Sequence, residues 1–283
     1  MDRLDALLRR FSVSARVFHS GPLCGIHDFA ATPDVGQLHL LQDGQVEVSH
    51  AGETLRVVEP SVLFYPRALP HRFTTDPQVG ARLACANVRF QEGVGNPLAR
   101  ALPNFVLLPM AELDGAAELL ALLFKEAFGQ RCGRQAIVDR LFEVVLIQIL
   151  RRLMMADATS TGMLSGMAHP QLSRALVALH ERPGAPWSLD TLAFEAGMSR
   201  SAFALHFRQV VGCTPGDYMA DWRLCLAQQG LREGRALKRI AFEVGYGSEA
   251  ALSRAFKARC GVSPREWRRG RGDDSAEAQA RDD

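Results

Sequence analysis

Residues 192–207 read Leu192-Ala-Phe-Glu-Ala-Gly197-Met-Ser-Arg-Ser-Ala-Phe-Ala-Leu-His-Phe207, and residues 240–256 repeat the pattern as Ile240-Ala-Phe-Glu-Val-Gly245-Tyr-Gly-Ser-Glu-Ala-Ala-Leu-Ser-Arg-Ala-Phe256. Each copy is followed by a Gly-x-x-Pro sequence, Gly212-Cys-Thr-Pro215 and Gly261-Val-Ser-Pro264. The second copy carries one extra residue in its turn and otherwise keeps the register of the first. A repeat of this kind indicates two copies of one structural unit.

Each copy predicts a helix-turn-helix. In the first, a short helix ends at Gly197, where the backbone can turn left-handed, and Ser199 caps the helix that follows. Phe203 and Phe207 lie four residues apart, so they place one apolar face of this second helix on the core. The matching residues of the second copy are Gly245, Ser248, Leu252 and Phe256. The outward face of each second helix is then free to enter a major groove of DNA.

The segment between the copies, residues 215–231, reads as one long helix. A rigid connector of this kind places both helix-turn-helix units on one face of a duplex. A separation of about one helical turn of DNA, ~34 Å, brings both second helices to successive major grooves.

Charge is distributed unevenly along the 283 residues. Residues 169–270 contain 15 lysines and arginines against 9 aspartates and glutamates, whereas residues 1–168 contain 16 against 17. The tail, residues 271–283, has 2 against 5 and no apolar pattern, which predicts disorder. A basic C-terminal module beside a nearly neutral N-terminal module is typical of a nucleic-acid reader with a separate sensor.

The pattern before the repeat changes once. Residues 1–110 contain short strand-like runs separated by turn residues, which predicts a β-sandwich or small barrel. Residues 111–168 begin with helical periodicity, and the segment 136–153 is apolar around most of its circumference, as in a buried or dimer-forming helix. Residues 156–168 read as a linker. The fold class is therefore α+β, with an all-α domain over 169–270.

The chain lacks the sequence signals of export and membrane insertion. No run approaches ~18 apolar residues, and the first residues show no signal peptide, so we expect a cytoplasmic protein that does not enter a membrane. The six cysteines form no Cys-x-x-Cys pair, and in the cytoplasm structural disulfides are not expected.

Residues 169–269 resemble the DNA-binding domain of the AraC/XylS family of transcription regulators, and the second repeat carries the most specific part of that likeness. The resemblance implies promoter DNA and RNA polymerase as partners and favours activation. It also implies a set of base-facing or DNA-facing residues. These are Ser201, Ala204, Leu205 and Arg208 in the first unit, and Glu249, Ala250, Ser253 and Arg254 in the second, with Lys257 near phosphate.

The first unit departs from the family pattern, because Ala204 and Leu205 replace long polar side chains. Such residues touch a thymine methyl group but make no bidentate base contact. We expect the first unit to rely on Arg200, Arg208 and DNA shape. In the second unit Arg254 is the best candidate for a base contact, with guanine as the natural partner. The alternative for each arginine is a solvated or phosphate-facing side chain.

The strand-rich segment resembles the cupin-like effector domain found at the N-terminus of this family. His39 and His71 occupy the positions of cupin histidines, and two imidazoles facing inward can ligate a metal. The usual second histidine and glutamate near the first are absent, with Leu41 and Asp43 in that stretch. The alternative is that both histidines are ordinary pocket or core residues, with no cofactor bound.

Two cysteines of the same segment, Cys24 and Cys85, resemble in position the paired cysteines of family members that sense reactive chlorine species. A reactive thiolate is the chemistry that such sensing needs. The alternative is that both are small buried apolar residues.

These observations predict a homodimeric regulator of the AraC type whose cupin-like domain responds to a small effector or an oxidant. The chain has no nucleophile elbow and no phosphate loop, so we do not expect an enzyme. Two other interpretations stay open. One is a cupin-type metal enzyme fused to a DNA-binding module, and the other is a constitutive DNA binder with a vestigial sensor.

Overall fold

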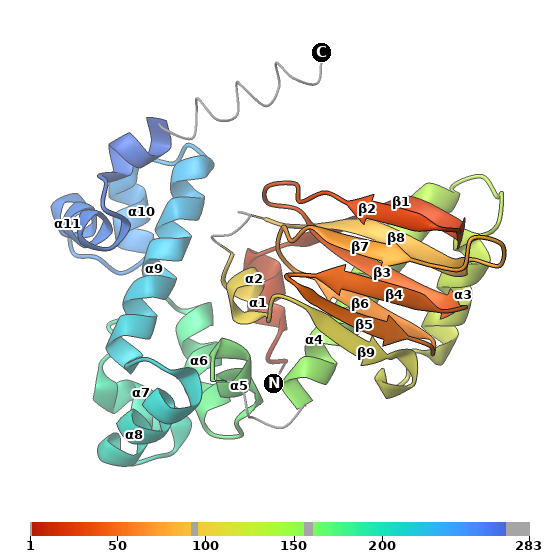
Figure 1. Cartoon of the computed structure of the whole chain (residues 1–283). Helices are drawn as coiled ribbons and strands as arrows, with labels where there is room; N and C mark the ends of the chain where they lie inside the picture. Colours follow the sequence, from red (N-terminus) through yellow and green to blue (C-terminus); the bar gives the residue numbers. More distant parts are fainter. Residues whose placement is uncertain (1, 92–95, 156–160, 270–283) are drawn as a thin grey trace. The chain divides into compact units, whose positions relative to one another are not determined.

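A computed structural model describes residues 2–91, 96–155 and 161–269 (Figure 1). The chain divides into two compact units. The N-terminal unit is Leu7–Thr159, and the C-terminal unit is Ser160–Asp283 together with Met1–Ala6. The predicted α+β class is confirmed, since strands dominate the first unit and helices the second.

The strands of the N-terminal unit form two antiparallel sheets that share one core. The five-stranded sheet has the order β1-β8-β3-β6-β9, with bounds β1 Val13–Leu23, β8 Ala81–Phe90, β3 Gly36–Asp43, β6 Ser61–Tyr65 and β9 Val106–Pro109. The four-stranded sheet has the order β2-β7-β4-β5, with bounds β2 Ile26–Phe29, β7 His71–Thr74, β4 Val46–His50 and β5 Glu53–Val57. Within the described residues these sheets stay separate and do not close into a barrel, which gives the cupin-like domain the form of a sandwich.

Alternation of apolar and polar residues explains the sandwich. In β4, Val46 and Val48 are fully buried between the sheets, while Glu47 points to solvent. β6 is buried on both faces, and Val62 and Phe64 are fully covered. Figure 1 shows helices α3, Ala117–Ala127, and α4, Arg134–Met155, behind the five-stranded sheet.

The edge strand β1 is covered by α4. The backbone amide of Val17 donates to Asp139 Oδ1 at 2.7 Å, and Gln135 Nε2 donates to the carbonyl oxygen of Val17 at 3.1 Å. Side chains of α4 thus satisfy backbone groups that an edge strand would otherwise leave open. The helices of residues 111–155 therefore belong to the same compact unit as the sheets. Two shorter elements precede them, α2 at Pro97–Ala101 and η2 at Met110–Glu112.

The predicted linker 156–168 is wrong over its second half, and its residues 156–160 lie outside the described residues. Helix α5, Met163–Ala168, is built into the C-terminal unit. Met167 is fully buried, and a Cβ on Gly166 would lie 2.7 Å from the Leu176 side chain. Small residues such as Gly166 allow this helix to pack closely on its neighbours. The same small residues made the segment look like a linker from its composition alone. The helical domain therefore begins before residue 169.

The first residues of the chain also join the C-terminal unit rather than the predicted sensor segment. Arg3 Nη1 donates to the carbonyl oxygens of Met167 and Ala168 at 3.1 and 2.8 Å. Helix α1, Asp5–Arg10, follows at the division between the two units.

The rest of the C-terminal unit contains the two predicted helix-turn-helix motifs. Helix α6, Leu172–Glu181, precedes α7, Leu189–Ala196, and α8, Arg200–Val211. Helix α9, Pro215–Arg232, connects this first motif to α10, Leu237–Glu243, and α11, Glu249–Cys260. The predicted disordered tail, 271–283, lies outside the described residues. No helix in the described part of the chain has the length and apolarity to span a bilayer.

Candidate functional site

The first recognition helix, α8, begins as its sequence predicts. Gly197 ends α7 in the left-handed conformation at φ 65°, and Ser199 Oγ accepts from the backbone amide of Ala202 at 3.3 Å. Phe203 is fully buried and Phe207 nearly so, which fixes one face of α8 on the core. The opposite face stays free for a ligand.

The second recognition helix, α11, repeats this construction. Gly245 has φ 83° in the turn, and Ser248 Oγ accepts from the backbone amide of Ala251 at 3.1 Å. Leu252 and Phe256 are fully buried. The two helix-turn-helix motifs therefore present equivalent helix faces to solvent, as the repeat predicts.

The ten predicted DNA-facing residues lie on these free faces. Eight are exposed and two, Ala204 and Ser253, are half-buried. Arg208 and Arg254 have no ion pair or side-chain hydrogen bond within the described part of the chain, so their guanidinium groups are available. Arg200 lies 3.6 Å from Asp190 in an exposed ion pair. The exposed residues are Arg200, Ser201, Leu205, Arg208, Glu249, Ala250, Arg254 and Lys257.

The predicted sensor histidines, His39 and His71, meet inside the sandwich. Their Nε2 atoms are 2.9 Å apart, and His71 Nδ1 lies 2.9 Å from the carbonyl oxygen of Leu69. His71 therefore donates a hydrogen bond from Nδ1, and its Nε2 accepts a hydrogen bond from His39 Nε2. Both rings are neutral, because burial lowers the pKa of His71 to about 4 and that of His39 well below its usual value.

Metal binding at this pair, which the cupin resemblance raises, stays a prediction. In the arrangement described here the Nε2 lone pair of His71 accepts the hydrogen bond from His39. Among the described residues, no three histidine, cysteine, aspartate or glutamate side chains gather in a way that could hold an ion. A metal site normally needs at least three protein ligands.

The cysteines predicted as sensors lie in different environments. Cys24 is exposed in the turn after β1, whereas Cys85 is fully buried in β8, and burial raises the pKa of its thiol. Leu23 pairs with Ala81, which is four residues before Cys85. At ~3.3 Å per residue the two cysteine Cα atoms are roughly 13 Å or more apart, beyond the ~7 Å that a disulfide allows. No direct bond forms between them in this conformation.

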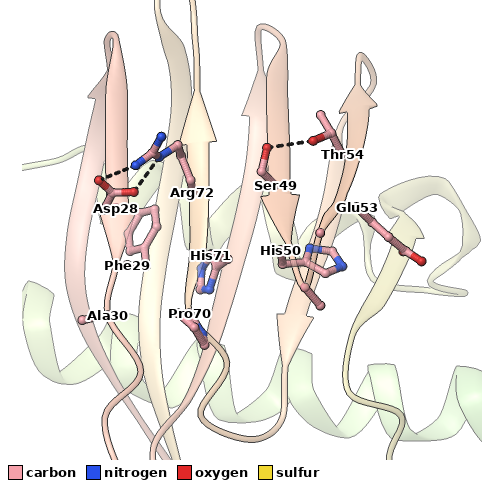
Figure 2. Close-up of a pocket in the computed structure, with 12 residues that line it drawn as sticks. Asp28, Phe29, Ala30, Ser49, His50, Glu53, Thr54, Pro70, His71 and Arg72 are labelled. Atoms are coloured by element: carbon pink, nitrogen blue, oxygen red, sulfur yellow. Dashed lines mark hydrogen bonds and ion pairs between the residues drawn. The ribbon is translucent and has the colours of Figure 1, made fainter.

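A pocket of ≈550 Å³ opens beside the buried histidines (Figure 2). One cross-strand row, Phe29–His71–His50–Glu53, runs across the four-stranded sheet and contributes to its lining. The Asp28–Arg72 ion pair, at 2.7 Å, lies on the neighbouring row. The bond to Arg72 lowers the pKa of Asp28, so this pair stays charged near neutral pH.

Aromatic contacts hold the two histidines that line this pocket, His50 and His71. The Tyr65 ring stacks on His71 with centroids 3.9 Å apart, and the Tyr65 hydroxyl lies 3.1 Å from His50 Nδ1. Phe29 also stacks with His71, at 4.9 Å. The pocket therefore combines the Phe29 ring with polar and charged side chains, among them the Asp28–Arg72 pair.

Comparison with known proteins covers both units. A family model described as a cupin matches residues 2–155, and a helix-turn-helix domain model matches residues 192–270. The HTH-type transcriptional regulator AlkR of Acinetobacter baylyi is 30% identical over 269 residues, which cover 83% of this chain and 85% of AlkR. An AraC-like transcription regulator of Streptomyces antibioticus, itself described as putative, is 38% identical over 172 residues, which cover 59% and 57% of the two chains.

The chain belongs to the AraC family of transcription regulators. It combines a cupin domain with the family's helix-turn-helix domain. The RCS-specific HTH-type transcriptional activator RclR of Escherichia coli is also similar, at 28% identity over 235 residues that cover 81% of this chain and 83% of RclR.

Sequence reasoning missed two histidines of this AraC-family chain. His19 pairs with Cys85 in β1–β8, and Cys85 pairs with His39 in β8–β3, so the three share one row facing the core. His19 Nε2 and His39 Nδ1 are buried without a hydrogen-bond partner in the described structure. The alternation of polar and apolar residues in β1 and β4 could have predicted that His19 and His50 lie on inner faces of the sheets. It could not have predicted that His19 lies beside His39.

Proposed function

We propose that this AraC-family regulator binds double-stranded promoter DNA through α8 and α11 in successive major grooves. The observation that supports this most directly is the pair of equivalent recognition helices. Each is capped by a serine and anchored by buried apolar residues, and each carries an exposed arginine, Arg208 or Arg254, on its other face. The basic charge of residues 169–270 supports the same function.

We propose that the cupin domain changes DNA binding in response to a signal, with a small organic effector as the first candidate. The pocket beside His50 and His71 supports this, since it places the Phe29 ring beside the polar Asp28–Arg72 pair. An oxidant is the second candidate. The exposed Cys24 thiol and the likeness to RclR favour it, whereas the burial of Cys85 restricts direct attack there.

We infer that the regulator is a cytoplasmic homodimer that activates transcription by contact with RNA polymerase, with α4 in the dimer interface. Ile137 and Val144, seven residues apart on α4, are 43% and 42% exposed, which supports an apolar seam.

We propose no enzymatic activity and no resident metal. The direct His39–His71 hydrogen bond supports this, and stoichiometric iron, manganese or zinc in the purified protein would contradict it.

The decisive experiment is binding to an operator selected from random duplex DNA. Wild type, Cys24→Ser and Cys85→Ser are compared with and without mild hypochlorite, and wild type also with a panel of small organic ligands. A ligand that shifts operator affinity supports the pocket, and an oxidant response that only Cys24→Ser abolishes supports a thiol switch. Binding that no ligand or oxidant changes indicates a constitutive binder, and failure to select any sequence contradicts specific DNA recognition.

A further inference from the structure

One guanidinium joins the two helix-turn-helix motifs. Arg223 lies on α9 and donates from Nε to the carbonyl oxygen of Pro183 at 2.9 Å and from Nη2 to that of Ala185 at 2.8 Å. Both carbonyls belong to the loop before α7. Its third group, Nη1, lies 3.4 Å from the carbonyl oxygen of Gly245, in the turn before α11. Arg223 thus binds the first motif's entry loop and the second motif's turn at once.

The backbones of these two segments also touch directly. A Cβ on Gly184 would lie 2.7 Å from the carbonyl oxygen of Glu243, and a Cβ on Gly245 would lie 3.0 Å from Gly184 Cα. Only glycine at both positions allows this approach, and Gly245 additionally has φ 83°. The contact is therefore built into the sequence at two separate positions.

The surroundings of Arg223 make its role specific. The side chain is half-buried, and burial lowers its pKa, so its charge is stabilised mainly by these three carbonyl dipoles. Among the described residues, none of its hydrogen bonds reaches a carboxylate. A planar guanidinium can serve three acceptors in fixed directions, which a lysine ammonium does not reproduce.

We propose that Arg223, with Gly184 and Gly245, is a positioning clamp that sets the distance and orientation between the two recognition helices. This proposal rests on the proposed DNA-binding function, and it adds Arg223 as the residue that sets the preferred spacing between the two halves of the operator. Figure 1 shows α9 running between α7–α8 and α10–α11, so without the clamp this helix is the main connection between the motifs. The clamp converts a helical connector into a fixed frame, so that both helices engage without further ordering.

The first test needs no DNA. Spin labels are attached through an unnatural amino acid at the exposed positions Gln209 on α8 and Ala258 on α11, and the distance distribution between them is measured in the full chain. Arg223→Met and Gly184→Ala are expected to broaden or shift it. The matched control Arg239→Met removes an exposed arginine of α10 whose ion pair, within the described part of the chain, is with Glu243, and it should leave the distribution unchanged.

The second test uses the selected operator, the same site with one half scrambled, and versions with one or two base pairs inserted between the halves. Arg223→Met should lose tenfold or more affinity for the full operator, keep half-site affinity within about twofold, and show a flatter dependence on spacing. Arg223→Lys should restore little.

Two results overturn the clamp. One is an unchanged distance distribution and spacing preference in Arg223→Met, which would show that α9 alone sets the geometry. The other is an equal loss on full and half sites together with a lowered melting temperature, which would show a purely structural role. The distance measurement separates failure of the clamp from failure of DNA recognition.

Discussion

At the residue scale, the recognition helices carry arginines and lysines whose roles differ. Arg254 and Lys257 are both exposed on α11, three residues apart. A bidentate contact from Arg254 to guanine depends on sequence, whereas a contact from Lys257 to phosphate does not. Arg254→Ala is expected to cost about 1–3 kcal/mol of discrimination at one base pair, and Lys257→Ala to weaken all sequences alike and reduce the salt slope by about one.

Competition binding against single-base variants of the operator, at several salt concentrations, measures both effects. Arg208→Ala provides the comparison in the first helix-turn-helix motif, where Ala204 and Leu205 limit direct readout of bases. If Arg254→Ala loses affinity equally for every variant, its side chain contacts phosphate and not a base.

A second residue-scale prediction concerns acid and the buried histidine pair. In the folded chain the pKa of His71 is about 4 against 6.5 for the unperturbed group, so the unfolded chain takes up this proton first. His71 therefore does not reduce the free energy of unfolding above pH 6.5. As the pH falls from 6.5 toward 4, protonation of this group in the unfolded chain lowers the free energy of unfolding. The full loss is about 3 kcal/mol. His71→Gln should flatten this dependence.

Urea unfolding of the full chain at several pH values measures this loss. The three tryptophans, Trp187, Trp222 and Trp267, all lie in the C-terminal unit, so their fluorescence follows that unit while far-UV circular dichroism includes the sheets. The control His206→Gln changes an exposed histidine of the C-terminal unit. An acid dependence identical in wild type and His71→Gln would contradict the assignment.

At the element scale, the start of α11 separates stability from recognition. Ser248→Ala removes the hydroxyl that accepts from the Ala251 amide, and about 1 kcal/mol of stability should be lost. Ser248→Asp keeps an acceptor at the cap but places a negative charge beside DNA phosphate. Tryptophan fluorescence should report lowered stability for the alanine variant only, and operator binding should weaken more for the aspartate variant. Equal stability of all three proteins would contradict the capping role.

The elements built from local signals could be predicted from the sequence. Gly197, Ser199 and the Phe203–Phe207 pair act within one turn or one helix, so their spacing alone predicts the motif. Long-range arrangements could not be predicted. The row His19–Cys85–His39 exists only because β8 pairs with both β1 and β3, which are distant in sequence. Helix α5 was missed because its small residues are buried by packing on α6 and α8 and not by an apolar run of its own.

The same distinction applies to the candidate sites. The residues predicted to face DNA follow from helix periodicity and the family resemblance, and the structure leaves them exposed or half-buried on α8 and α11. The clamp at Arg223 does not follow, because its three acceptors lie up to 40 residues away along the chain. The cupin resemblance placed His39 and His71 at the positions of cupin histidines, but their direct hydrogen bond and the stacking of Tyr65 on His71 depend on the two sheets facing each other.

At the scale of the whole molecule, two compact units must act together if a signal in one is to change DNA binding by the other. A dimer formed through the N-terminal unit would raise the effective concentration of the second pair of recognition helices at a paired site. The exposed apolar positions of α4 bear directly on this, because a solvated helix would place polar residues there.

The last prediction follows from that surface. Ile137→Glu and Val144→Glu each put a charge into an apolar seam, where burial of an unpaired carboxylate is unfavourable, so the dimer dissociation constant should rise tenfold or more. Light scattering at micromolar concentrations should show dimers for wild type and monomers for the variants. Val79→Glu, at an apolar position 80% exposed in a loop far along the chain from α4, is the control and should stay dimeric. The variants should also lose affinity for paired operators while they keep binding to a single one. A monomeric wild type at tens of micromolar would contradict the seam, and the exposed residues of α4 would then need another partner.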